Sequence, residues 1–197
     1  MVKARSVAPG QLLLGFDSDP VVIAAELTMS LVARSPGSLV IPELGIATRR
    51  ARVDLAHVTD QLAGFEIKGS RDDLDRLDHQ QAAFSATFER MTLVAATRHV
   101  LPARSRIPDW WGLMAVGPNG LEVLRPALPN PTLDPAALAA LLWRDEAAAM
   151  LRVTGRGRGR MTRAQMVGLI SAEMSPVEIS RAVCAAFRAR REWRTAA

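Results

Sequence analysis

Two consecutive apolar runs, each interrupted by acidic residues, constrain the fold of this chain most. The first run is RARVDLAHV, which contains Asp54, and the second is LAGFEIKGS, which contains Glu66 and Lys68. Only the residues TDQ separate the runs, a spacing that predicts two strands joined by a tight turn. Side chains two positions apart share one face of a strand. We therefore expect Glu66 and Lys68 to point the same way, while Ile67 points into a core on the other side.

Pairing of these two strands would bring Asp54 to the same patch as Glu66 and Lys68. Carboxylate oxygens are the ligands that hard divalent cations prefer. A bound cation activates water and neutralises charge on a phosphate, and a lysine can orient the water or stabilise the developing negative charge. The pattern thus indicates a metal-dependent phosphodiesterase site.

A hairpin with an exposed Glu–Lys pair is the structural alternative, and such a pair would contribute little to stability. The dense apolar surroundings of Glu66 and Lys68 favour the site, because Glu and Lys are rarely placed among buried positions without partners.

Asp54 with Glu66-Ile67-Lys68 resembles the core motif of the PD-(D/E)XK nuclease superfamily. Further stretches, from about Glu43 to Glu146, resemble a family of small bacterial and phage proteins that was first named after a myxobacterial reading frame and is usually assigned to the same fold. They are RARVDLAHV, GFEIKGSRDDLDRL, QQAAFSATFER, MTLVAATRH, IPDWWGLMAV, RPALPNPTLDP and ALLWRDE. The resemblance implies an α/β, restriction-endonuclease-like core, with a mixed sheet flanked by helices.

The resemblance also implies roles for individual residues. Asp54 and Glu66 would be metal ligands, joined by the backbone carbonyl of Ile67, and Lys68 would be the catalytic lysine. The cofactor would be Mg²⁺ or Mn²⁺. Gln80 matches a Gln-x-x-x-Tyr element that orients the active site in some relatives, although Phe84 replaces the tyrosine here.

The identity of a third acidic ligand stays open at the level of sequence. Glu43 lies just before the first of the two strands, at a place where related sequences also carry an acid. Glu26 lies on the first predicted helix, where many members of the superfamily place a carboxylate. We favour Glu43 slightly, because a surface position is the ordinary role of a helical glutamate.

The remaining chain divides into alternating helical and strand-like segments. The apolar patterns predict a helix at 20–35, with Pro20 at its first position and Asp17, Ser18 or Asp19 as its cap. They also predict a helix at 70–90, capped by Ser70, and a short helical piece after residue 97. Strands are expected at 38–44, 51–58, 62–69, 91–97, 111–116 and 121–124. Near the C-terminus we expect helices at 135–151, capped by Asp134, at 162–173, and at 175–193, with Ser175-Pro176 as its start signal.

A proline-rich segment, RPALPNPTLDP, predicts a boundary between a nuclease-like α/β core at 1–126 and a helical C-terminal subdomain at 127–197. Ten arginines and only three glutamates lie from residue 150 onward, so this part is strongly basic. A basic tail beside an acidic site is typical of nucleic-acid enzymes. Solvated helix faces would explain the same charge. We expect the nucleic-acid contacts to come from Arg156, Arg158, Arg160 and Arg163.

Composition points to a cytoplasmic protein. The chain of 197 residues lacks an apolar run long enough to span a bilayer, and its first apolar run is too short for a signal peptide. The single cysteine, Cys184, excludes an internal disulfide and a cysteine-based zinc cluster.

Three functions remain at this stage. The first is a Mg²⁺- or Mn²⁺-dependent nuclease acting on DNA, in processing, repair or phage and mobile-element conflict. The second is a catalytically silent module of nuclease fold that binds nucleic acid or a protein partner. The third is a transcription regulator that uses its last two helices as a helix-turn-helix, although these lack a clear glycine-containing turn. A homodimer is expected by analogy, because many nucleases of this fold cut duplexes in pairs.

Overall fold

A mixed six-stranded sheet forms the centre of the protein, in a computed structural model that describes residues 19–46, 51–117, 120–157 and 159–190. The strands lie in chain order: β1 (Leu39–Gly45), β2 (Arg52–Val58), β3 (Leu62–Lys68), β4 (Arg90–Ala96), β5 (Gly112–Gly117) and β6 (Gly120–Arg125). Strands β3, β4 and β5 are mutually parallel, and the other neighbours are antiparallel. The predicted mixed sheet flanked by helices is confirmed.

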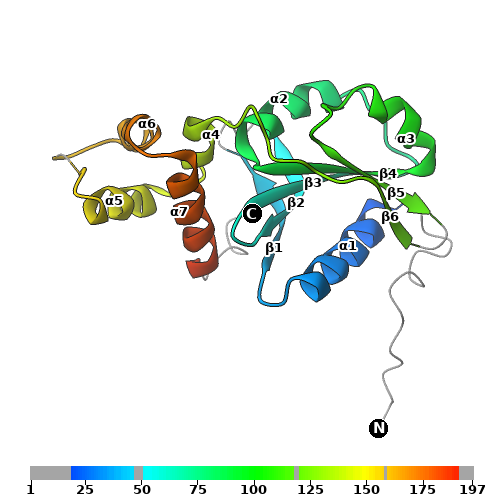
Figure 1. Cartoon of the computed structure of the whole chain (residues 1–197), viewed down its shortest axis with the longest axis horizontal. Helices are drawn as coiled ribbons and strands as arrows, with labels where there is room; N and C mark the ends of the chain where they lie inside the picture. Colours follow the sequence, from blue (N-terminus) through cyan, green and yellow to red (C-terminus); the bar gives the residue numbers. More distant parts are fainter. Residues whose placement is uncertain (1–18, 47–50, 118–119, 158, 191–197) are drawn as a thin grey trace, which may run out of the picture.

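Helices cover both faces of this sheet (Figure 1). α1 (Pro20–Arg34) lies on one face, and α2 (Leu77–Thr87) and α3 (Thr97–Arg104) lie on the other. α1 begins where the sequence predicts, because the Asp19 side chain accepts a hydrogen bond from Val21 N–H and Pro20 occupies the first helical position.

The alternation of side chains along β3 separates two apolar clusters. Phe65 and Ile67 pack with α1 residues such as Ile23, whereas Leu62 belongs to the cluster that contains Phe84 of α2. Glu66 has the same parity as Leu62 and therefore faces α2. The apolar residues of β3 thus decide which face carries the acidic and basic side chains.

The helix predicted to begin at Ser70 begins seven residues later, at Leu77, and that prediction is wrong. The Asp72 carboxylate accepts a hydrogen bond from Gly69 N–H at 2.7 Å, and Asp72 N–H donates back to the Gly69 carbonyl. Asp73 likewise accepts from the N–H of Asp75. Aspartates that bond nearby backbone groups compete with the helical pattern, so this acidic segment forms turns instead.

Four helices form the C-terminal part: α4 (Pro135–Ala139), α5 (Arg144–Val153), α6 (Arg163–Glu173) and α7 (Pro176–Ala189). The single helix expected at 135–151 is wrong, because α4 and α5 are separate. The Glu146 carboxylate accepts a hydrogen bond from Trp143 N–H at 2.7 Å, which starts α5 as a new helix. The predicted caps of α4 and α7 are present, at Asp134 and Ser175, and Thr162 caps α6.

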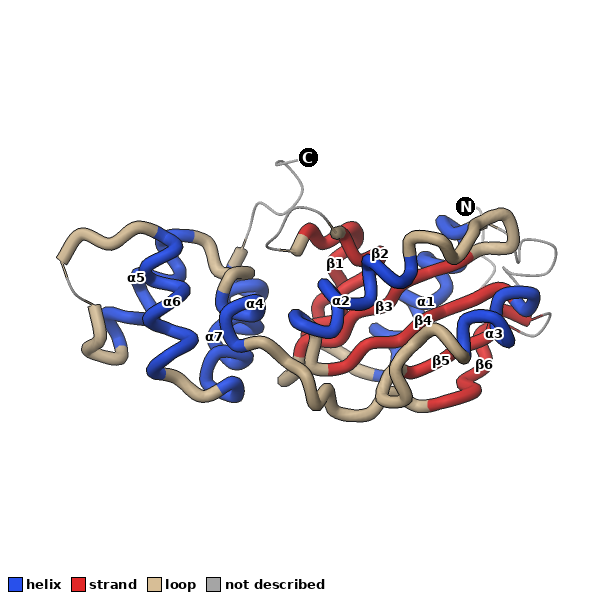
Figure 2. Tube along the Cα trace, turned by 90° about the horizontal axis from the view of Figure 1, so that it is seen from above, coloured by secondary structure: helices blue, strands red, loops and turns tan. Residues whose placement is uncertain are grey.

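The C-terminal helices lie beside the sheet, with α4 and α7 nearest to it (Figure 2). Their buried residues belong to the same apolar cluster as Leu62 and Phe84. Glu89 links the two parts, because its carboxylate accepts hydrogen bonds from Leu62 N–H at 2.7 Å and from the Ser180 hydroxyl at 2.6 Å. The helical part is therefore held against the α/β part by a continuous core.

None of the helices in the described ranges combines the length and the apolar character needed to cross a bilayer. Cys184 is buried among apolar residues of α7, and burial raises the pKa of its thiol to about 11.

Candidate active site

The site lies where the β2–β3 ladder ends. The paired residues run from Val58–Leu62 to Leu55–Phe65, so Asp54 would stand opposite Glu66 if pairing continued. Instead, Asp54 Oδ2 accepts a hydrogen bond from Ile67 N–H at 2.6 Å. A side-chain carboxylate thus replaces the backbone acceptor that Ile67 would otherwise use. This substitution places Asp54 beside Glu66 at the point where the strands separate.

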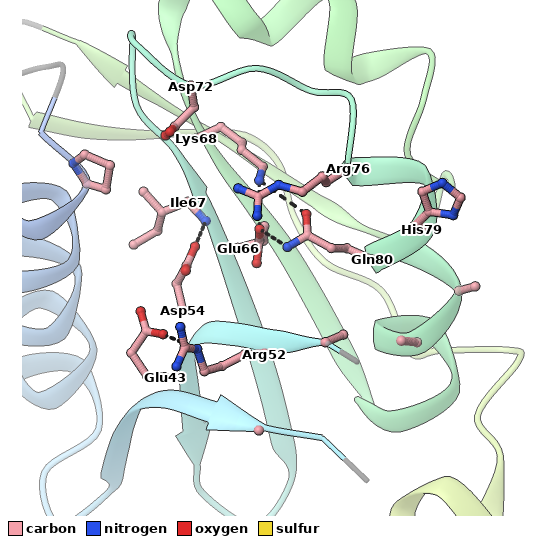
Figure 3. Close-up of a pocket in the computed structure, with 15 residues that line it drawn as sticks. Glu43, Arg52, Asp54, Glu66, Ile67, Lys68, Asp72, Arg76, His79 and Gln80 are labelled. Atoms are coloured by element: carbon pink, nitrogen blue, oxygen red, sulfur yellow. Dashed lines mark hydrogen bonds and ion pairs between the residues drawn. The ribbon is translucent and has the colours of Figure 1, made fainter. Parts of the chain in front are cut away.

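Glu66, Lys68 and Gln80 form a closed network on the α2 face of β3 (Figure 3). Lys68 Nζ lies 2.9 Å from Glu66 Oε1 and donates to Gln80 Oε1 at 3.3 Å. Gln80 Nε2 in turn donates to Glu66 Oε1 at 2.8 Å. The structure therefore brings the sequence-predicted residues Asp54, Glu66, Lys68 and Gln80 to one place. Phe84, one helical turn after Gln80, is fully buried in the core.

Burial disfavours the ionised form of both carboxylates at this site. Desolvation, followed by the neighbouring charge of Asp54, raises the pKa of Glu66 to about 7, although the Lys68 ammonium acts in the opposite direction. Desolvation also raises the pKa of Asp54, and the hydrogen bond from Ile67 N–H partly offsets that shift. A cation placed between the two carboxylates would favour their ionised forms.

The donor atoms fit a hard divalent cation. Glu66 Oε2 is buried and lacks a hydrogen-bond partner, so its desolvation is uncompensated. In the described ranges, no group of three or more His, Cys, Asp or Glu side chains could together hold a metal ion. The available set is two carboxylates with neighbouring backbone oxygen, and Mg²⁺ is commonly held by one or two carboxylates while it keeps several waters.

Of the two alternatives for a third acid, Glu43 lines the same cavity as Asp54, whereas Glu26 does not. Glu43 has φ of 54° and pairs with Arg52 Nε at 2.5 Å, and both side chains are more than half exposed. Glu26 is buried on α1, 4% exposed, and its Oε2 has no hydrogen-bond partner. The geometry therefore favours Glu43, although its carboxylate is engaged by Arg52.

A cavity of about 1000 Å³ opens over these residues. Sequence reasoning missed two of its basic side chains, Arg76 and His79, which line the wall formed by α2. The signal that could have found Arg76 is its spacing from Gln80. Arg76 lies four residues before Gln80, and positions four apart lie on one face of a helix.

Two of the four arginines predicted to contact nucleic acid, Arg156 and Arg163, instead bond other residues of the protein. Arg163 donates to the backbone carbonyls of Leu142 and Ala140, which ties the start of α6 to the α4–α5 connection. Arg156 Nε lies 3.4 Å from the Glu173 carboxylate. Arg160 is exposed and lines a second cavity beside α5, and Arg158 lies outside the described residues. Contact of these four arginines with nucleic acid stays a prediction, weakest for Arg163.

The raised pKa of Glu66 predicts a pH-dependent stability in the absence of metal. Between its ordinary value of 4.5 and about 7, the carboxyl binds a proton in the folded protein but not in the unfolded chain. The free energy of unfolding should therefore fall as pH rises through this window, by up to about 3 kcal/mol.

Urea denaturation in EDTA at several pH values between 5 and 8 would measure this dependence. Glu66→Gln cannot titrate and should show a flatter profile than the wild-type protein. Parallel profiles for the two proteins would show that Glu66 ionises normally.

Comparison with known proteins places the chain in a family. The profile described as Bacteriophage P4 protein cII matches residues 23–195. The chain belongs to the phage P4 cII family. Protein cII of Enterobacteria phage P4 is 33% identical to this cII-family chain over 84 residues, which are 43% of this chain and 32% of that protein. The match thus spans about a third of the length of this curated relative.

A protein of unknown function from Silicibacter pomeroyi is a structural neighbour, with a TM-score of 0.41 and 20% sequence identity over 80% of this chain and 99% of that chain. A likeness of this size carries no functional argument. The name of the cII family states no reaction. The residues of the cavity are therefore what indicates the chemistry of this cII-family protein.

Proposed function

We propose that this protein is a Mg²⁺- or Mn²⁺-dependent nuclease that hydrolyses phosphodiester bonds of DNA. One observation carries the proposal: Asp54, Glu66 and Lys68 meet at the end of a strand ladder, and Glu66 Oε2 is buried without a partner. Buried acids with raised pKa values beside a lysine, in an open cavity, are typical of functional sites and costly as structural elements.

A PD-(D/E)XK type of fold is part of the proposal. Its support is the resemblance at Asp54 and Glu66-Ile67-Lys68, together with the order of elements around them. The hairpin β2–β3 carries the acids and the lysine, α2 follows with Gln80, and β4 returns parallel to β3. This order puts the hairpin and the helix on the same cavity.

The proposed mechanism assigns a separate task to each side chain. Asp54 and Glu66 would hold the metal ion, which activates water and neutralises phosphate charge when bound. The Lys68 ammonium would hold a positive charge near the attacked phosphate and donate a hydrogen bond to it or to the attacking water. Gln80 would keep Glu66 and Lys68 in register, because its amide bonds both of them.

A module that only binds nucleic acid or a protein partner is the second candidate. The observation that favours it is the closed hydrogen-bond network of Glu66, Lys68 and Gln80, which uses Glu66 Oε1 and the lysine within the protein. Such a module would bind its partner regardless of divalent cations.

Cleavage assays distinguish the two candidates. Purified protein would be incubated with linear duplex, supercoiled and single-stranded DNA, and with RNA of the same sequence, in Mg²⁺, Mn²⁺ or EDTA. We expect cleavage of at least one DNA substrate that requires metal and stops in EDTA. Binding without cleavage of any substrate in either metal would contradict the nuclease proposal.

A further inference from the structure

Among the described residues that line the cavity, one arginine has no partner within the protein. Lys68 is bonded to Glu66 and Gln80, and Arg52 is paired with Glu43. Arg76 also lines the cavity, yet its guanidinium makes neither an ion pair nor a hydrogen bond with another described residue. An arginine held over an acidic site without a protein partner is available for an anionic ligand.

Its position aims this guanidinium at the site. Arg76 is the residue immediately before α2, and Gln80 follows one helical turn later. Figure 3 shows the Arg76 side chain extending over the cavity toward Lys68 and Gln80, on the side opposite Arg52. Arg76 reaches this position because the aspartate-rich segment forms turns and delays the start of the helix.

We propose that Arg76 binds a backbone phosphate of the DNA strand that enters the cavity. The choice of DNA as the ligand of this cavity rests on the proposed nuclease function. A phosphodiester approaching two carboxylates is repelled unless positive charge surrounds it, and a planar guanidinium can bond two phosphate oxygens at once. Arg76 would therefore set the position of the strand relative to the groups on β2 and β3.

The rest of the lining supports binding of backbone phosphate without reading of bases. Several of the described lining residues are small: Gly45, Ala51, Ala82 and Ala83. These described lining residues include no Phe or Trp, and His79 is their one aromatic ring on which a base could stack. The contact of Arg76 should therefore be indifferent to sequence.

Fluorescence anisotropy of labelled duplex and single-stranded oligonucleotides of two unrelated sequences would test this. Ca²⁺ would replace Mg²⁺, and salt would vary between about 50 and 200 mM. Arg76→Gln should weaken binding about tenfold on both sequences and reduce the salt slope by about one. Arg76→Lys should recover part of the affinity, because it restores the charge without the fork.

Arg34→Gln is the matched control. Arg34 is exposed at the opposite end of α1 from Pro20, which lines the cavity, and the two positions are about 21 Å apart at the helical rise. This variant should bind like the wild-type protein. Thermal melting of Arg76→Gln should also be unchanged, since no described contact is lost.

Arg76→Gln with wild-type affinity and salt slope would overturn the inference even if metal-dependent cleavage is observed. Binding that depends on Arg76 without any cleavage would keep the phosphate contact and remove the nuclease function. Failure of the wild-type protein to bind any oligonucleotide would overturn the contact as well. A loss of affinity for only one sequence would replace the phosphate contact with a base contact.

Discussion

Asp54→Asn should reduce DNA cleavage by about 1,000-fold or more while leaving the fold intact. The asparagine side-chain oxygen can still accept the hydrogen bond that Ile67 N–H now donates to Asp54 Oδ2. The substitution removes only the negative charge, and with it the metal ligand. Because burial raises the pKa of Asp54, the neutral variant should be at least as stable as the wild-type protein.

Cleavage rates in Mg²⁺ and Mn²⁺, together with thermal melting in EDTA, would measure both effects. Asp75→Asn provides the matched control, because this exposed carboxylate lies outside the cavity lining and should leave cleavage unchanged. Retention of more than about a tenth of the wild-type rate in Asp54→Asn would exclude Asp54 as a metal ligand.

Lys68→Met belongs to the same experiment, because it removes the ammonium and keeps the apolar part of the side chain. We expect a loss of about 100-fold or more in cleavage rate. Loss of the neighbouring positive charge would also raise the pKa of Glu66 further, so metal binding should weaken at neutral pH relative to the wild-type protein. If the cleavage rate of Lys68→Met recovers fully at saturating metal and higher pH, the role of Lys68 is only to lower the pKa of Glu66.

Arg190→Ala should lower the free energy of unfolding by about 3–5 kcal/mol, the largest effect on stability that we expect. The Arg190 side chain is 4% exposed and bonds both carboxylate oxygens of Glu146, at 2.7 and 2.6 Å. It also donates to the Leu141 carbonyl, and its guanidinium lies 4.3 Å from the Trp143 ring centre. Removing it would leave the Glu146 carboxylate without its main partner.

Urea denaturation followed by circular dichroism would measure this loss at neutral pH. Burial opposes ionisation of Glu146, yet the Arg190 hydrogen bond leaves its pKa below the usual 4.5. The contribution of the pair should therefore be present above about pH 4.5 and disappear as pH falls through the lower folded-state pKa.

Two further variants serve as controls for Arg190→Ala. Arg190→Lys should lose less stability than Arg190→Ala, so a folded protein stays available for measurement. Arg181→Ala, at an exposed position on α7, the helix that Arg190 follows, should change stability by no more than about 0.5 kcal/mol. Equal losses in Arg181→Ala and Arg190→Ala would show that the Glu146 pair contributes nothing specific.

Local signals in the sequence predicted much of the fold. Asp19 with Pro20 and Ser175 with Pro176 start helices where their side chains cap the first backbone N–H groups. The predictions were wrong where side-chain hydrogen bonds to the backbone compete with a continuous helix. The turn at Asp72 and the new helix at Glu146 each replaced a helix that apolar periodicity favoured. Hydrogen bonds from backbone N–H groups to acidic side chains decided both cases.

Alternation along one strand determines, from the sequence alone, that Glu66 and Lys68 share a face. Only the tertiary structure decided which other groups meet them, because sequence carries no distance between separate elements. The end of the β2–β3 ladder brought Asp54 to Glu66, and the path through α2 brought Gln80 and Arg76 over the same cavity. The tertiary structure also placed Glu43, rather than Glu26, at that cavity, since α1 packs on the opposite face of the sheet from α2.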